Sequence, residues 1–458
     1  MSRATTSARI VMGAVVSAAA VAAVVGAGAA PWPAVGAAAP STDVLPAPAE
    51  VLLACDGPLL ALARSAEDAA GVSAAADAAV ISGDASGERL EQGELTLSGV
   101  ADATAPLFRR SPEGREPVPA AAASSVEARD MDLGGFAASE CRAPQMESWI
   151  VGGDVATGTT GILLVANPTD ANAVVSLDVF GVEGVTTPAG ADAIAIPAGA
   201  QVPIPLAGIA GGEEAPAVRV TAVGSPVRVT LQSSIVRTLE PGGIDLQPAV
   251  APAATQVLPG VNVTPEASEG ENSSGLVRLL STADATATVT VLPEGGGVPV
   301  RAPEEVALTA DQPKSADLGG LPAGRYTVLV DADQPVVAAA WQATGFGPGS
   351  DYAWYAAAPP VERATLFAVP DGPNPRVSVY NPGDEAVTVA VSGDDGEQSL
   401  EVDAHAFASV ALPGSGLYTL DPGGSTLHTL LGFEGGSVLA ALPITQDASM
   451  PRPLTVYP

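Results

Sequence analysis

The clearest hydrophobic pattern in the chain lies at residues 161–180, where two apolar runs flank an Asn-Pro turn. The first run is 161–166, and the turn follows at Asn167 and Pro168. In the second run, apolar and polar side chains alternate: Val175, Ser176, Leu177, Asp178 and Val179. An alternation with a period of two is typical of a β-strand with one buried face. The segment therefore predicts two strands connected by a tight turn.

This pattern recurs at 276–291 and at 376–391, where an Asn-Pro pair again forms the turn. Further alternating segments follow each copy in a similar order. Among them, we expect 217–221 and 226–231 to form a hairpin that turns at Gly224 and Ser225. A repeat of about 100 residues with about seven short strands is typical of an immunoglobulin-like sandwich. The repeats lack a Cys–Trp–Cys pattern, so we do not expect antibody-type domains.

These segments predict an all-β fold: tandem immunoglobulin-like β-sandwich domains after an N-terminal transmembrane or signal helix. The expected domains are a signal peptide or transmembrane anchor at 1–30, a Pro/Ala-rich spacer at 31–50, an N-terminal β-rich module closed by a disulfide at 51–145, and β-sandwiches 1, 2 and 3 at 146–258, 259–362 and 363–458. The fold of 51–145 stays open. Segments 50–54 and 94–100 resemble strands, whereas the Ala-rich stretch 59–80 admits a short helix.

The N-terminus indicates the compartment. Arg3 and Arg9 precede 10–30, a stretch without any charge that is built mainly of Ala, Val and Gly. At about 1.5 Å per residue a helix of this length spans roughly 30 Å, the thickness of a bilayer core. The arginines predict a cytoplasmic N-terminus. We favour a retained single-pass anchor in the cell membrane, with secretion after signal cleavage as the alternative. In both cases the bulk of the chain lies outside the cytoplasm.

The composition favours many short strands over long helices. The chain contains 50 Gly and 42 Pro, and only 4% of its residues are aromatic. The core therefore has to consist mainly of Val, Leu, Ile and Ala. The formal net charge is −32, and such a surface repels nucleic-acid phosphates. We expect no nucleic-acid binding, and we favour solubility over calcium binding as the role of the acidic residues.

Cys55 and Cys141 are the only cysteines. In an oxidising compartment an even count predicts a disulfide, with two buried free thiols as the alternative. A bridge across this loop would stabilise the fold by roughly 4–5 kcal/mol in the chain-entropy model. The cysteines and histidines show no ligand spacing, so we expect no metal site and no cofactor.

Motifs for catalysis are absent from the sequence, which contains no G-x-S-x-G, H-E-x-x-H or P-loop pattern. The only histidines, His405 and His428, both lie in segments that resemble the polar face of a strand, so we expect neither to act in a catalytic triad. A glycosidase with paired carboxylates stays open, because the pair need not be close in the sequence. Our prediction is that the protein is not an enzyme.

The most distinctive local feature is an aromatic cluster. Five of the 17 aromatic residues (7 Phe, 4 Trp, 6 Tyr) fall within 341–355: Trp341, Phe346, Tyr352, Trp354 and Tyr355. The glycines and the proline between them predict a loop. We name Trp341, Tyr352, Trp354 and Tyr355 as candidate residues for binding a sugar or a protein partner. The alternative, which we favour, is that the rings fill a joint between domains.

Three segments carry a resemblance to a known family: 146–153 (MESWIVGG), 164–168 (LVANP) and 175–181 (VSLDVFG). They resemble an uncharacterised actinobacterial family of N-terminally anchored, extracytoplasmic envelope proteins, known only as a domain of unknown function. The resemblance covers nearly the whole chain. It implies a link to envelope polysaccharide, because genes of that family often lie near a large membrane glycosyltransferase. It implies no catalytic residues.

Together these observations predict a non-catalytic cell-envelope scaffold or interaction protein, exposed outside the cytoplasmic membrane. The alternative is a carbohydrate-binding protein that uses the aromatic loop 341–355, and the third hypothesis is an envelope glycan hydrolase. The expected partners are the cytoplasmic membrane, through residues 10–30, and envelope polysaccharide or a membrane glycosyltransferase system.

Overall fold

The computed structural model describes residues 3–29, 42–44, 46–62, 64, 71–213, 215–268, 275–446, 448–449 and 454–456. Most of the predicted spacer, including 31–41, lies outside the described residues. The chain divides into two compact units. Unit 1 comprises Met1–Pro46 with Arg452–Pro458, and unit 2 comprises Ala47–Pro451.

Unit 1 contains helix α1 (Arg3–Ala29) and a two-stranded antiparallel sheet of β1 (Thr42–Val44) and β35 (Leu454–Val456). Within α1, the span Ala8–Gly26 is long and apolar enough to cross a membrane. None of its side chains is buried against the rest of the chain. The predicted N-terminal apolar helix is therefore confirmed. A signal sequence has the same length and composition, so the choice between anchor and cleaved signal stays a prediction.

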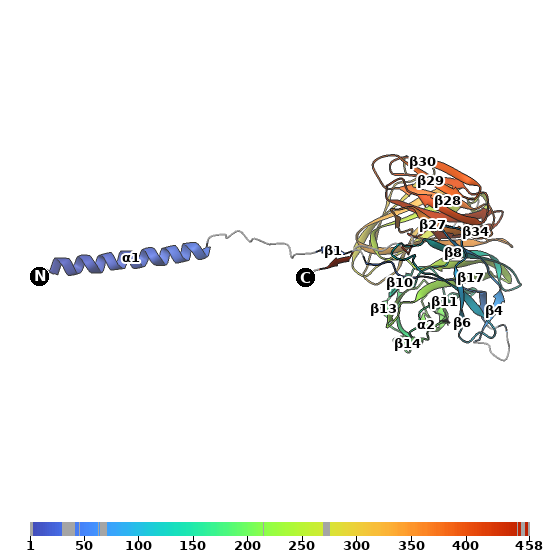
Figure 1. The fold of residues 1–458 in the computed structure, drawn as a ribbon, viewed down its shortest axis with the longest axis horizontal. Helices are drawn as coiled ribbons and strands as arrows, with labels where there is room; N and C mark the ends of the chain where they lie inside the picture. Colours follow the sequence, from blue (N-terminus) through green and yellow to red (C-terminus); the bar gives the residue numbers. More distant parts are fainter. Residues whose placement is uncertain are drawn as a thin grey trace. The chain divides into compact units, whose positions relative to one another are not determined.

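The regular structure of unit 2, over its described residues, consists of strands and two single-turn helices, α2 (Leu206–Ile209) and α3 (Pro265–Ser268). The prediction of an all-β fold is confirmed. The strands form four successive two-sheet modules: an N-terminal module and sandwiches 1, 2 and 3. In Figure 1 the strands of sandwich 3, orange to red, and those of sandwich 1, green, lie on opposite sides of unit 2. Since Ala47–Pro451 is one compact unit, the predicted domain boundaries stay predictions.

Sandwiches 1 to 3 share one plan of eight strands. The first, sixth, third and fourth strands form one sheet, and the eighth, seventh, second and fifth form the other. In sandwich 1 these strands are β10 (Glu147–Ile150), β11 (Thr159–Asn167), β12 (Ala173–Gly181), β14 (Ile194–Ile196), β15 (Ala200–Pro205), β16 (Ala217–Val223), β17 (Arg228–Arg237) and β18 (Glu240–Pro248), with the short β13 (Gly184–Thr186) beside β12.

Sandwich 2 is built from seven strands because one long strand serves both sheets. They are β19 (Ala253–Val263), β20 (Gly275–Ser281), β21 (Ala285–Pro293), β22 (Glu304–Leu308), β23 (Lys314–Asp317), β24 (Gly324–Ala343) and β25 (Tyr352–Ala356). The first half of β24 pairs with β19 and β21 and acts as the sixth strand. Its second half pairs with β20 and β25 and acts as the seventh.

Sandwich 3 again has eight separate strands. They are β27 (Thr365–Val369), β28 (Arg376–Asn381), β29 (Val387–Gly393), β30 (Gly396–Val402), β31 (Ala406–Ala411), β32 (Gly416–Asp421), β33 (Leu427–Gly435) and β34 (Val438–Pro443). The short β26 (Pro360–Val361) pairs with the edge of β33.

The N-terminal module has the same plan without the fourth and fifth strands. Its strands are β2 (Val51–Ala54), β5 (Ala79–Asp84), β6 (Glu91–Leu97), β7 (Thr104–Arg110), β8 (Ala120–Arg129) and β9 (Gly134–Glu140). In all four modules the first, sixth and third strands pair in one sheet, and the eighth, seventh and second pair in the other. These orders correspond to strands B-E-D and G-F-C of immunoglobulin-like sandwiches. A parallel pairing of β6 with β15 continues one sheet of this module into sandwich 1.

Two expectations about local structure are wrong. The Ala-rich stretch 59–80 contains no helix in its described part; it forms β3 (Leu59–Leu62), β4 (Val72–Ala76) and the start of β5. The expected hairpin of 217–221 and 226–231 is not formed, because β16 and β17 lie in opposite sheets of sandwich 1. Their apolar side chains do face one core: Val218, Val220, Val227, Val229 and Leu231 belong to one buried cluster.

The repeated Asn-Pro turn has a clear structural reason. Asn167 is fully buried at the end of β11, where its Nδ2 donates to the carbonyl oxygens of Ala171 (2.8 Å) and Ile196 (3.0 Å). Asn381 repeats this at the end of β28, with Nδ2 bonded to the carbonyls of Glu385 (2.8 Å) and Val402 (3.2 Å). Each amide thus satisfies buried backbone groups where the chain crosses from one sheet to the other.

The four modules close into a ring through their last strands, β9, β18, β25 and β34. β18 packs beside β9 and β25, and β34 packs beside β25 and β9. Each last strand also contributes side chains to a neighbouring module. Ile244 and Leu246 of sandwich 1 join the core of the N-terminal module, and Leu439 of sandwich 3 joins that of sandwich 2.

The same exchange closes the ring between the first and last modules. Phe136 of the N-terminal module joins the core of sandwich 3, where its ring lies 5.5 Å from that of Phe433. Tyr352 of sandwich 2 reaches into sandwich 1, where its hydroxyl donates to Ser233 Oγ at 2.8 Å. Every module is therefore packed against both of its neighbours in the ring.

One carboxylate connects the four last strands. Asp351, fully buried directly before β25, accepts backbone N–H bonds from Phe136 (3.0 Å), Ile244 (3.1 Å) and Tyr352 (3.0 Å), and a fourth from Leu439. These donors come from β9, β18, β25 and β34, one strand of each module. Burial raises the pKa of Asp351 to about 7, although the four N–H groups favour the ionised form.

Glycine makes room for this carboxylate. Gly135 and Gly243 have φ of 142° and 119°, and a Cβ at either position would come within 2.7 Å of Asp351 Oδ1. A side chain there would displace the carboxylate and strain the backbone. The ring centre therefore depends on these two glycines and on one acid.

Candidate functional site

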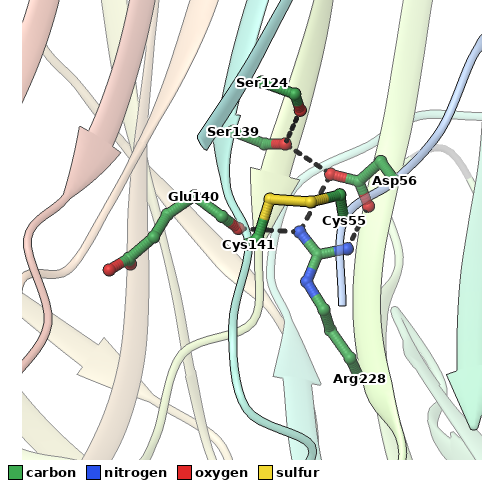
Figure 2. Close-up of a disulfide and its surroundings, with 7 residues drawn as sticks. All are labelled: Cys55, Asp56, Ser124, Ser139, Glu140, Cys141 and Arg228. Atoms are coloured by element: carbon green, nitrogen blue, oxygen red, sulfur yellow. Dashed lines mark hydrogen bonds and ion pairs between the residues drawn. A yellow bond between two sulfur atoms is a disulfide. The ribbon is translucent and has the colours of Figure 1, made fainter. Parts of the chain in front are cut away.

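The predicted disulfide is present. Cys55 and Cys141 are bonded, with their Cα atoms 4.3 Å apart, and both are buried. They follow β2 and β9, so the bond joins the two sheets of the N-terminal module (Figure 2).

An internal ion pair lies beside the disulfide (Figure 2). Asp56 forms a two-point pair with Arg228 of β17, with Nη2 to Oδ2 at 2.9 Å, and both side chains are buried. Ser139 also donates to Asp56 Oδ2 at 2.6 Å. Burial disfavours the ionised form of Asp56, but the Arg228 charge and these hydrogen bonds outweigh it and lower the pKa of Asp56. The pair is shielded from solvent and links Asp56 of the N-terminal module to Arg228 of sandwich 1, so its role is structural.

The predicted loop is present at 344–351, between β24 and β25, but it carries only Phe346 of the five aromatic residues. Trp341 is in β24, and Tyr352, Trp354 and Tyr355 are in β25, the strand that pairs with it. Tyr352, Trp354 and Tyr355 are 1%, 5% and 2% exposed, Trp341 is partly exposed, and Phe346 of the loop is 43% exposed. The rings therefore contribute to a joint between modules, which is the alternative that we favoured.

Three of these four aromatic residues line a pocket of about 180 Å³ between sandwiches 1 and 2. From sandwich 2, Trp341 and Trp354 lie opposite each other in neighbouring strands, and Tyr352 lies 6.0 Å from Trp341 between ring centroids. Sandwich 1 contributes residues 153–154 and 159–160 and the β17 segment 233–235. Tyr355 points to the other face of β25, where its hydroxyl accepts the N–H of Asn262 at 3.2 Å. We call this cavity the Trp341 pocket.

Arg278 of β20 provides the positive charge of the Trp341 pocket. It is 4% exposed, its guanidinium lies 5.0 Å over the Trp354 ring, and it forms no ion pair within the described residues. Nη1 donates to the carbonyls of Val151 (3.3 Å), Gly153 (2.6 Å) and, more weakly, Pro216 (3.4 Å). Nε is buried without an acceptor.

Burial lowers the pKa of Arg278 to about 10, and the carboxylate of Asp154 opposes this shift. The guanidinium therefore stays charged at neutral pH. Asp154 also lines the pocket but is partly exposed to solvent. The Trp341 pocket thus combines aromatic walls, hydroxyl groups and a buried cation that lacks a direct counter-ion.

The sequence reasoning missed Arg278. The signal is visible, because a single arginine interrupts the apolar run Leu276, Val277, Leu279 and Leu280. A charge in such a run points either to a strand edge or to a buried charge with a specific role. The buried Arg228, between Val227 and Val229, has the same signature.

The other chemical candidates are dispersed. His405 lies in a turn rather than on a strand, paired with Asp384 at 2.9 Å, whereas His428 of β33 contacts the carbonyl oxygen of Ala358 at 2.7 Å. Asp331 and Asp333, which lie in β24, accept hydrogen bonds from Thr255 and Thr286. Within the described residues, no group of three or more His, Cys, Asp or Glu side chains is arranged to hold a metal ion.

No curated protein sequence matches the chain. A family model described as a family of unknown function, DUF5719, matches residues 96–413. This range includes β7–β9 of the N-terminal module, sandwiches 1 and 2, and β27–β31 of sandwich 3. Because this match covers more than half of the chain, the protein belongs to that family of unknown function.

Proposed function

We propose that the protein is a non-catalytic interaction protein of the cell envelope, held at the outer face of the cytoplasmic membrane by α1. The observation that supports this most is the closed ring of four modules, each packed into its neighbours through its last strand. A single rigid body of this kind offers large outer surfaces of several sheets to partners. The apolar α1 and the disulfide agree with a location outside the cytoplasm.

The location can be tested with single-cysteine reporters, because both native cysteines are in the disulfide. In the Val298→Cys variant the new thiol replaces a side chain that is 85% exposed in unit 2. A membrane-impermeant maleimide should label it in intact cells. The matched Thr6→Cys variant, before the apolar span, should be labelled only after lysis. Labelling of Val298→Cys only after lysis contradicts the proposed topology.

The interaction role needs a second measurement. Intact cells that contain the tagged full chain are crosslinked chemically, and their membranes are solubilised in detergent. Purification through the tag should then recover one envelope component at a constant ratio to the chain. Purified protein that depolymerises envelope polysaccharide would instead support the hydrolase hypothesis and overturn the non-catalytic proposal.

A second candidate function is glycan binding, which the Trp341 pocket favours. Sugar rings stack their C–H faces on aromatic side chains, and Trp341 is the partly exposed indole at this pocket. The binding surface differs from the exposed loop expected from the sequence. In this form the protein would hold an envelope polysaccharide near the membrane, in line with the implied link to polysaccharide assembly.

A further inference from the structure

We infer that the Trp341 pocket binds a sugar residue that carries a carboxylate, such as a uronic acid within a glycan. This inference rests on the proposed glycan-binding function and adds the charge and size of the ligand to it. Neither the family match nor the sequence pattern assigns a ligand to this cavity.

The charge of the ligand follows from Arg278. A buried cation is normally compensated by a carboxylate, because removing an uncompensated charge from water is unfavourable. Arg228 has such a partner in Asp56. Arg278 instead contacts backbone carbonyls and the Trp354 ring, and the Asp154 carboxylate acts on it without forming an ion pair. A ligand carboxylate in the pocket would supply the missing negative charge. The planar guanidinium is suited to this contact.

The single charge favours a carboxylate over a phosphate. A phosphate monoester carries close to two negative charges at neutral pH. One cation would leave part of that charge uncompensated, and the nearby Asp154 would repel a double negative charge more strongly than a single one. A carboxylate has one charge and matches Arg278 alone.

The walls and the volume indicate a sugar. The cavity of about 180 Å³ is smaller than the roughly 300–1,000 Å³ of pockets that enclose drug-sized ligands. It suits one ring with its substituents. Trp341 offers the aromatic face, and the hydroxyl-bearing residues Ser233, Ser234 and Thr160 are among those that line the cavity from sandwich 1. These groups match a ring with one apolar face and several hydroxyl groups.

The test compares three soluble probes on the detergent-solubilised full chain by titration calorimetry and tryptophan fluorescence. The probes are methyl glucuronide, methyl glucoside and inorganic phosphate. Methyl glucuronide should bind at least about ten-fold more tightly than methyl glucoside, since a charge-assisted hydrogen bond is considerably stronger than a neutral one. Trp341→Ala should weaken the binding of both sugars.

Variants separate the charge effect from a folding defect. Arg278→Lys should weaken the binding of methyl glucuronide by about ten-fold, because an ammonium group lacks the planar set of donors that can bond the backbone carbonyls and a carboxylate together. Asp154→Asn keeps the acceptor for the Ala156 N–H and removes the repulsive charge. It should therefore increase the affinity for methyl glucuronide about two- to five-fold. Glu183→Gln, a matched change at an exposed residue outside the pocket, should leave binding unchanged.

The outcomes separate the inference from the function on which it rests. Equal affinity for methyl glucoside and methyl glucuronide, with no effect of Asp154→Asn, refutes the inference that the ligand carries a carboxylate and leaves the glycan-binding function intact. Tighter binding of phosphate than of methyl glucuronide also refutes it. Absence of binding by both sugars overturns the glycan-binding function together with the inference.

Discussion

Among single residues, Asp351 has the widest structural effect because four strands from four modules donate their N–H groups to it. Burial raises the pKa of its carboxyl from 3.8 to about 7. The folded protein therefore holds this proton at pH values where the unfolded chain has lost it. Its contribution to stability is fully present below pH 3.8 and is lost as the pH rises through about 7.

We predict that the free energy of unfolding of the wild type falls between pH 4 and pH 8 by up to about 4 kcal/mol from this group, because the shift is about three units at about 1.4 kcal/mol each. Asp351→Asn removes the titration, so its pH profile should be flatter over this range. Urea unfolding at several pH values measures both profiles. Asp394→Asn, at an exposed turn residue, is the control and should keep the wild-type slope. Identical slopes for Asp351→Asn and the wild type would contradict the assignment.

Single residues also mark where sequence reasoning reaches its limit. The alternation of Val175, Leu177 and Val179 predicts buried side chains, and all three are at most 1% exposed, because a strand's two faces follow from local geometry. No local rule identifies Asp351 as the ring centre. Its partners are up to 215 residues away in the sequence, and they use backbone groups, which leave no trace in residue identity.

At the scale of elements, strand existence was predictable, but strand pairing was not. The segments at β16 and β17 both alternate, and both face one core. A hairpin and a crossing between two sheets give the same alternation, so the sequence cannot distinguish them. The Ala-rich β4 forms a strand with the Leu-rich β3 although Ala and Leu favour helices, because tertiary packing overrides a weak propensity. The glycines and the proline of 345–349 predict the loop between β24 and β25, but they do not reveal that the aromatic residues on either side lie in strands.

The last strands are the elements that hold the ring closed, and Phe136 of β9 tests this. Phe136→Ala removes a side chain that is 6% exposed within the core of sandwich 3. We expect a loss of stability of about 3–5 kcal/mol. The substitution weakens the contact between the first and last modules. Hydrogen exchange should therefore also accelerate at the backbone amides that donate hydrogen bonds to Asp351, which lie in strands of all four modules.

Phe367→Ala is the matched control, since Phe367 is equally buried but belongs to sandwich 3 itself. A similar loss of stability is expected there, with faster exchange confined largely to sandwich 3. If the two variants had the same exchange pattern, β9 would have no special role in closing the ring.

For the whole molecule, ring closure changes the unfolding behaviour expected of four tandem modules. A linear string of sandwiches unfolds module by module. Here the N-terminal module and sandwiches 1 and 3 contribute side chains to a neighbour's core, and Tyr352 of sandwich 2 is hydrogen-bonded to sandwich 1. The Asp56–Arg228 pair and the parallel pairing of β6 with β15 add further links between the first two modules. Ala47–Pro451 should therefore unfold in one cooperative transition, which calorimetry can resolve.

The disulfide tests this cooperativity, because it lies within the N-terminal module alone. It closes a loop with a sequence separation of 86, so replacing both cysteines by alanine should destabilise the protein by roughly 4–5 kcal/mol in the chain-entropy model. In a closed ring this loss shifts the entire transition, including the exchange of sandwich 2 amides, to lower temperature. A reducing agent should reproduce the shift in the wild type and have no effect on the double variant. Two separate transitions, with only the first one shifted, would instead show that the N-terminal module unfolds independently and that the ring does not act as one cooperative body.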